Sequence, residues 1–79
     1  MKVYELAPNN GHKSFYGKAK VIVEDNTETL VSYDTPVMRR YSNGKLERLW
    51  SGWGPTTGRH VAAFCGINKK QYEDMEVVK

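Results

Sequence analysis

Residues 37–50 read Val-Met-Arg-Arg-Tyr-Ser-Asn-Gly-Lys-Leu-Glu-Arg-Leu-Trp. Asn43 and Gly44 tolerate the left-handed backbone of a tight turn, and both flanking runs carry apolar side chains, so the stretch predicts a β-hairpin. A two-residue loop would fix the register of the two strands. The expected facing pairs are Tyr41 with Leu46, Arg40 with Glu47, Arg39 with Arg48, Met38 with Leu49, and Val37 with Trp50.

The residues before this hairpin predict further strands. Residues 1–6 suit a short edge strand, which residues 8–11 end with a proline, two asparagines and a glycine. Apolar residues return from Phe15 onward, and residues 18–24 alternate as in a strand with one buried side. The side chains expected on that buried side are Ala19, Val21 and Val23.

Two turn signals divide the next part of the chain. Asp25 and Asn26 suit a tight turn that leads into a strand over residues 27–33. Pro36 cannot donate a backbone hydrogen bond, so it predicts a bend between strands or a bulge on an edge strand.

A short helix is expected after the hairpin. Residues 51–55 contain two glycines and a proline and predict a loop. Thr56 or Thr57 can cap a helix that runs through Cys65 and ends at Gly66. The helical stripe expected to face the sheet consists of Val61, Phe64 and Cys65.

A second helix is expected near the C-terminus. Asn68 followed by Gln71 three residues later is the pattern of a capping box, and it predicts a helix to about Met75. Together these elements predict one α+β domain over residues 1–79, an antiparallel β-meander of about four to five strands followed by one or two short C-terminal helices.

Composition limits the possible functions. The chain has 79 residues, a net charge of +3 and a single cysteine, Cys65. One cysteine cannot form an internal disulfide, which favours a reducing compartment, and no apolar run is long enough for a signal or a membrane span. We therefore expect a cytoplasmic protein that does not bind membranes, and its mild positive charge permits a polyanionic partner.

Catalytic residues are sparse. His12 and His60 lack the neighbours of a metal site, and Cys65 follows His60 by five residues, too far around a helix for a thiolate and base pair. The carboxylates cluster only near a turn and on the last helix, and no phosphate-binding glycine loop is present. We therefore expect no enzymatic activity, no metal and no cofactor.

The most informative region for function is residues 50–60, Trp-Ser-Gly-Trp-Gly-Pro-Thr-Thr-Gly-Arg-His. It places cationic groups in the first turns of a helix, where the helix dipole favours anions. An acidic partner or a phosphate held there would explain this arrangement. The alternative is that Arg59 pairs with a nearby Glu or carbonyl while His60 packs against Phe64. The candidate binding residues are Trp53, Thr56, Thr57, Arg59 and His60.

A second set of cations suggests nucleic-acid binding as an alternative. Arg39 opposite Arg48 would be a like-charge pair, which either splays into water or receives an anion. With neighbouring aromatic rings, such a surface would suit single-stranded nucleic acid. The residues of this alternative site are Arg39, Lys45, Arg48 and Arg59.

Two motifs carry a family resemblance. Residues 32–37 read Ser-Tyr-Asp-Thr-Pro-Val, and residues 56–61 read Thr-Thr-Gly-Arg-His-Val, followed by Phe64. In this order of parts the chain resembles small proteins encoded by phages and conjugative elements of Gram-positive bacteria, over residues 14–72. The resemblance implies an accessory protein of a mobile element and supplies no activity. The leading hypothesis is thus an interaction module for an acidic macromolecule; nucleic-acid binding, a small phosphorylated ligand at Thr56–His60, and a homo-oligomer paired through residues 1–6 are the alternatives.

Overall fold

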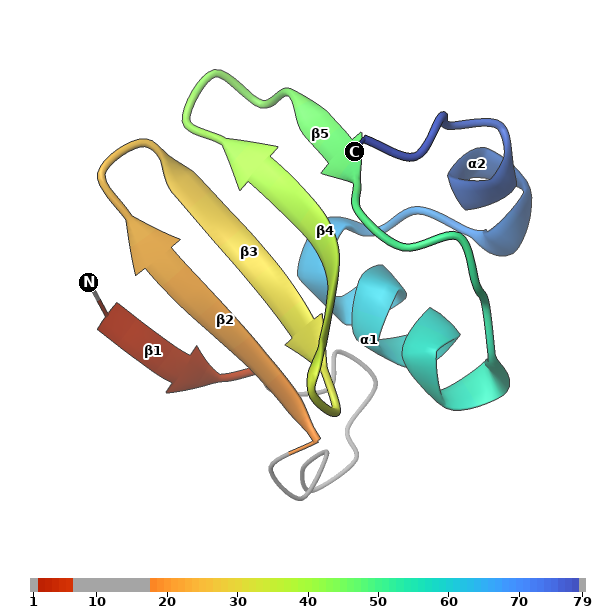
Figure 1. Cartoon of the computed structure of the whole chain (residues 1–79), viewed down its shortest axis with the longest axis horizontal. Helices are drawn as coiled ribbons and strands as arrows, with labels where there is room; N and C mark the ends of the chain where they lie inside the picture. Colours follow the sequence, from red (N-terminus) through yellow and green to blue (C-terminus); the bar gives the residue numbers. More distant parts are fainter. Residues whose placement is uncertain (1, 7–17, 79) are drawn as a thin grey trace.

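A computed structural model describes residues 2–6 and 18–78 and shows a five-stranded sheet followed by two helices (Figure 1). The strands are β1 (Lys2–Glu5), β2 (Ala19–Glu24), β3 (Thr27–Ser32), β4 (Thr35–Tyr41) and β5 (Leu46–Arg48), and the helices are α1 (Pro55–Cys65) and α2 (Lys69–Glu73). Every strand pairs antiparallel with the next one in sequence. The predicted α+β meander is confirmed; Phe15 and residues 8–11 lie outside the described residues.

The alternation predicted for β2 is confirmed. Ala19 and Val21 are fully buried and Val23 packs against the core. Val21 pairs with Leu30 of β3, which pairs with Met38 of β4, so these side chains form a row on the face that the helices cover. No helix of residues 2–6 and 18–78 lies on the opposite face of the sheet (Figure 1).

The register predicted for the β4–β5 hairpin is wrong by one residue. Tyr41 pairs with Lys45 through a backbone hydrogen bond of 2.8 Å, and Gly44 donates to the Tyr41 carbonyl at 2.9 Å. The loop therefore has three residues, and Gly44 adopts a φ of 91°, as in a turn closed by a glycine bulge. A shift of one residue exchanges the faces of a strand. The observed pairs are Met38 with Arg48, Arg39 with Glu47, and Arg40 with Leu46.

The β3–β4 connection is a two-residue turn followed by a bulge. Ser32 pairs with Thr35, and Tyr33 between them has a φ of 59°, which is uncommon for a bulky residue. The register then shifts between Leu30 and Val31. Pro36 lies at this irregularity, as predicted, although β4 is an interior strand because β5 pairs with its other side.

Both helix ends near residue 67 agree with the prediction. Gly66 ends α1 with a φ of 75°, and its N–H donates to the Ala62 carbonyl. Asn68 caps α2, and its side chain and that of Gln71 bond each other's backbone N–H reciprocally. The helix ends at Glu73, earlier than the expected Met75.

The core lies between the sheet and the helices. From α1 it receives Val61 and Phe64, as predicted, whereas Cys65 is only partly buried at its margin. From α2 it receives Tyr72, which is fully buried. The buried apolar residues are Leu6, Ala19, Val21, Leu30, Val37, Met38, Val61, Phe64 and Tyr72.

Candidate functional site

Helix α1 begins without a capping side chain. Its N-cap is Gly54, Pro55 is the first helical residue, and the first turn contains no acidic residue. Neither Thr56 nor Thr57 is the N-cap, so that prediction is wrong. Proline fits the first helical position because its φ is already helical and its missing N–H would have no partner there. The helix therefore starts ahead of both threonines.

Thr57 and His60 point into the molecule. His60 is fully buried, and its Nδ1 lies 2.7 Å from the Ser32 hydroxyl oxygen. The same hydroxyl lies 3.2 Å from that of Thr57. The ring centroid of Tyr33 lies 6.0 Å from that of His60. Burial lowers the pKa of His60. Thr57 and His60 connect α1 to β3 through Ser32, and because both are buried they are not accessible to a partner.

The Trp53 ring lies next to Gly58 in the first turns of α1. A Cβ at Gly58 would come within 2.5 Å of its ring, and the ring centroid lies 5.0 Å from that of Tyr72. Trp53 is partly buried and packs against the core. Its position is that of a side chain covering the core, with one part left for solvent.

Thr56 and Arg59 form the exposed part of the predicted site. Both are exposed, and they lie three residues apart on α1, which places them on the same helical face. Arg59 forms no ion pair with any residue in 2–6 or 18–78. Long helical side chains lean toward the N-terminus, so we expect the Arg59 side chain to lean toward the first turn of α1, which has no capping side chain. We call Thr56, Arg59 and this turn the α1 face.

Arg48 is not a surface cation, and its assignment to a nucleic-acid site is wrong. The one-residue shift places it on the helix-covered face, where it is 8% exposed. Its guanidinium donates to the carbonyls of Trp50 at 2.9 Å, Ser51 at 2.7 Å, Tyr72 at 3.2 Å and Met75 at 3.0 Å. It also lies 4.3 Å from the Tyr72 ring centroid. Arg48 thus joins β5, the following loop and α2.

Arg39 and Lys45 remain on the surface without Arg48. Arg39 faces Glu47, not Arg48, and forms an ion pair with it at 3.3 Å. Tyr41 also donates to Glu47 at 2.6 Å, and this hydrogen bond is the main reason why the pKa of Glu47 is lowered. The Lys45 ammonium lies 6.0 Å from the Tyr41 ring centroid. The predicted like-charge pair does not exist, and one of its two cations is already neutralised.

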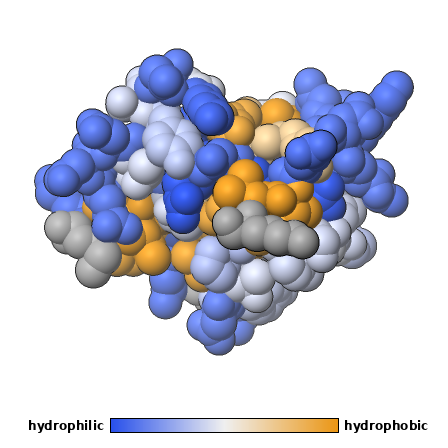
Figure 2. Space-filling model, turned by 45° about the horizontal axis from the view of Figure 1, so that its top comes forward, coloured by the Kyte–Doolittle hydropathy of each residue, from blue (hydrophilic) through white to orange (hydrophobic). Residues whose placement is uncertain are grey.

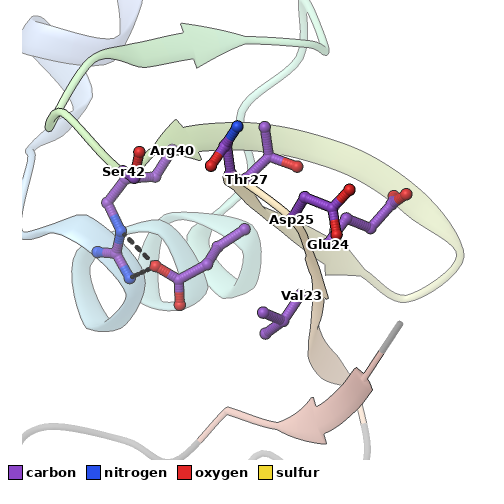
Figure 3. A pocket seen from close by; sticks show the side chains of 8 residues that line it. Val23, Glu24, Asp25, Thr27, Arg40 and Ser42 are labelled. Carbon is purple, nitrogen blue, oxygen red and sulfur yellow. Dashed lines mark hydrogen bonds and ion pairs between the residues drawn. The ribbon is translucent and has the colours of Figure 1, made fainter.

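A hollow of about 220 Å³ lies beside the β2–β3 turn (Figure 3). Arg40 at its wall bonds Glu28 through two nitrogens, at 3.0 and 3.1 Å, and donates to the Phe64 carbonyl at 2.7 Å. Glu24 and Asp25 complete the charged lining. With its arginine engaged in this way, the hollow is acidic and does not suit an anion.

Exposed apolar side chains lie at scattered places. The large ones are Val3, Tyr4, Tyr33 and Val78. Figure 2 shows hydrophobic atoms in separate patches within a mostly hydrophilic surface. In the described part of the chain, no group of three or more His, Cys, Asp or Glu could hold a metal ion, and no helix is long and apolar enough to cross a membrane.

Two polar residues, Arg48 and Ser32, have structural roles that were not predicted from the sequence. The role of Arg48 could have been predicted from the correct register, because a charged strand residue on the core side must find hydrogen-bond partners within the protein. The predicted register was wrong and placed Arg48 on the other face of the sheet. The role of Ser32 could not have been predicted from local sequence, because its partners Thr57 and His60 are 25 and 28 residues away.

A comparison with protein-family models matches residues 1–79 to the Family of unknown function (DUF8033). No curated protein and no solved structure matches the chain. The description of the family supplies no ligand and no activity, so functional inference depends on the geometry of this molecule.

Proposed function

The chain belongs to this family of unknown function, and from the geometry of α1 we propose that it is a non-enzymatic interaction module that binds an acidic macromolecular partner through the α1 face. The observation that supports this proposal is that a helix start without a capping side chain and an exposed arginine occur together in α1. The turn has no capping side chain and no acidic residue, while Arg59 is exposed without an ion pair in the described residues.

The electrostatics of this turn favour an anion. The first N–H groups of a helix lack partners within the helix and carry partial positive charge. Thr56 adds a hydroxyl donor and Arg59 adds a fork of N–H donors suited to a carboxylate. Thr57 and His60 contribute by fixing α1 on the sheet, and Trp53 by covering Gly58.

We propose that the protein is an accessory protein of a mobile element, as the sequence resemblance implies, and that it acts in the cytoplasm, which its single cysteine favours. Its partner would be a protein with an acidic patch. Direct nucleic-acid binding would have fewer accessible cations than the sequence suggested, because Arg48 is buried and Arg39 is paired with Glu47. A small phosphorylated ligand would likewise find only Thr56 and Arg59 accessible.

A binding titration tests the proposal. We would titrate the protein into a fluorescent poly-glutamate peptide, and separately into a fluorescent single-stranded oligonucleotide, at several salt concentrations. We expect binding of the acidic peptide and a roughly fivefold loss in Arg59→Ala, since an exposed ionic contact contributes up to about 1 kcal/mol.

The matched control is Lys20→Ala, which removes one exposed positive charge from β2. We expect it to weaken binding much less than Arg59→Ala. Equal losses in both variants would mean that only net charge matters and would refute the α1 face. Binding of the oligonucleotide alone, with a steep dependence on salt, would favour nucleic acid instead.

A further inference from the structure

We propose that His60 makes the docking of α1 on the sheet sensitive to pH. The proposal follows from where the imidazole lies. His60 is fully buried, and its Nδ1 contacts the hydroxyl of Ser32, which is 2% exposed. The same hydroxyl contacts that of Thr57, which is 7% exposed. These three side chains connect the first half of α1 to the end of β3.

Protonation of His60 would place a charge inside this contact. A neutral Nδ1 can accept a hydrogen bond from the Ser32 hydroxyl or donate one to it. If it accepts, protonation reverses that bond, and Ser32 must turn its hydrogen toward Thr57. If it already donates, the new proton goes to the other ring nitrogen. In both cases a positive charge forms on a side chain that is fully buried, which is unfavourable.

Among the described residues, the charged groups near His60 are mainly cations. On the β3–β4 turn, the Tyr33 ring lies 6.0 Å from His60, and the Lys18 ammonium from the start of β2 lies 5.8 Å from that ring. Arg59, the next residue on α1, adds another positive charge, and the carboxylate of that turn, Asp34, is exposed. Burial lowers the pKa of His60 below its ordinary value of 6.5.

The other half of α1 is held by a contact that does not change with pH in this range. Arg40 donates to the Phe64 carbonyl at 2.7 Å, and its guanidinium lies 4.4 Å from the Phe64 ring centroid. An arginine stays charged throughout. Acidification would therefore loosen mainly the first turns of α1, which carry the α1 face.

The direct test is a titration of the imidazole by NMR. His12→Gln leaves His60 as the sole imidazole, since the chain has two histidines. We expect the His60 ring protons of the folded protein to titrate at a lower pH than the same protons in the urea-unfolded chain. A folded-state midpoint equal to or above the unfolded one would overturn the proposal.

A second test measures stability. The unfolded chain binds the proton on His60 more readily than the folded one does. The contribution of neutral His60 to stability is therefore fully present above pH 6.5 and is lost as the pH falls from there toward the lowered pKa of the folded state. We expect the urea midpoint of the wild type to fall more between pH 7.5 and 5.0 than that of His60→Gln, whose carboxylates are unchanged. Parallel profiles for the two proteins would contradict the inference, and the NMR titration decides the question if His60→Gln does not fold.

Discussion

Arg48 is the residue on which most of the C-terminal structure depends. It has no carboxylate partner among the described residues, and backbone carbonyls satisfy its guanidinium. We expect Arg48→Lys to lower the free energy of unfolding by about 2–4 kcal/mol, because an ammonium cannot reach these carbonyls from one point and leaves some of them buried without a donor. Urea unfolding measures the loss.

Arg39→Lys is the control for this substitution. Arg39 is partly exposed and its pair with Glu47 is open to solvent, so we expect a change within about 0.5 kcal/mol. Similar losses in both variants would mean that Arg48 stabilises the fold by its charge alone.

Tyr33 has a backbone conformation that its side chain disfavours. A φ of 59° costs a residue with a Cβ about 1–2 kcal/mol, whereas glycine adopts it freely. Tyr33 is 50% exposed. We expect Tyr33→Gly to be as stable as the wild type or up to about 1 kcal/mol more stable in urea unfolding. Tyr33→Ala keeps the Cβ and loses the ring, so it should be less stable than Tyr33→Gly; the reverse order would show that the ring contacts dominate.

At the scale of the elements, α1 depends on a close fit between Gly58 and Trp53. A Cβ at Gly58 would meet the Trp53 ring at 2.5 Å, so something must move. Alanine is the better helix former by about 1 kcal/mol; we nevertheless expect Gly58→Ala to destabilise the protein by about 1–3 kcal/mol, because overpacking outweighs that gain.

A double-mutant cycle tests this cause. In a Trp53→Phe background the smaller ring leaves room, so Gly58→Ala should cost less there. An unchanged cost in that background would mean that contact with Trp53 is not the reason. Thermal unfolding followed by circular dichroism measures all four proteins.

Helix α2 is short and therefore depends on its capping box. Asn68 and Gln71 satisfy each other's backbone N–H groups, and a helix of five residues has little stability of its own. We expect Asn68→Ala to lower the free energy of unfolding by about 1 kcal/mol, whereas the exposed Ser51→Ala should change it little. Equal effects would argue against a structural role for the cap.

At the scale of the whole molecule, the two edges of the sheet differ. The β5 edge is covered by the C-terminal segment, in which Val77 bridges Arg48 and the Val78 N–H donates to the Arg48 carbonyl at 2.7 Å. Within the described residues no segment pairs with the outer edge of β1. A small domain has only a few kcal/mol of net stability, so the contact of residues 77–78 with β5 is a large part of that stability.

Deletion of residues 77–79 should therefore destabilise the protein by about 1–2 kcal/mol in urea unfolding and should increase self-association in light scattering, because it opens a strand edge. A control with Val78→Ala keeps the backbone hydrogen bond and should stay close to the wild type. An unchanged stability after the deletion would show that the segment is only in contact with β5 and does not hold it.

The sequence by itself determined the order and type of the elements. Alternation in β2, the turn residues at 25–26 and 43–44, Gly66 and the capping box of α2 act over a few residues, and local backbone preferences are present in any chain segment. A helix start close to Arg59 was predicted in the same way, although the expected threonine cap is absent and Pro55 begins the helix.

Only the tertiary structure decided which polar side chains are accessible. The loop of the β4–β5 hairpin has three residues instead of two. The resulting shift of one residue in the register places Arg48 on the core side of the sheet and not on its surface. His60 and Thr57 turned inward because Ser32, 28 and 25 residues away, lies beneath them. The physical reason is that burial depends on contacts between distant segments, and the register of a strand or the facing of a helix sets all those contacts at once.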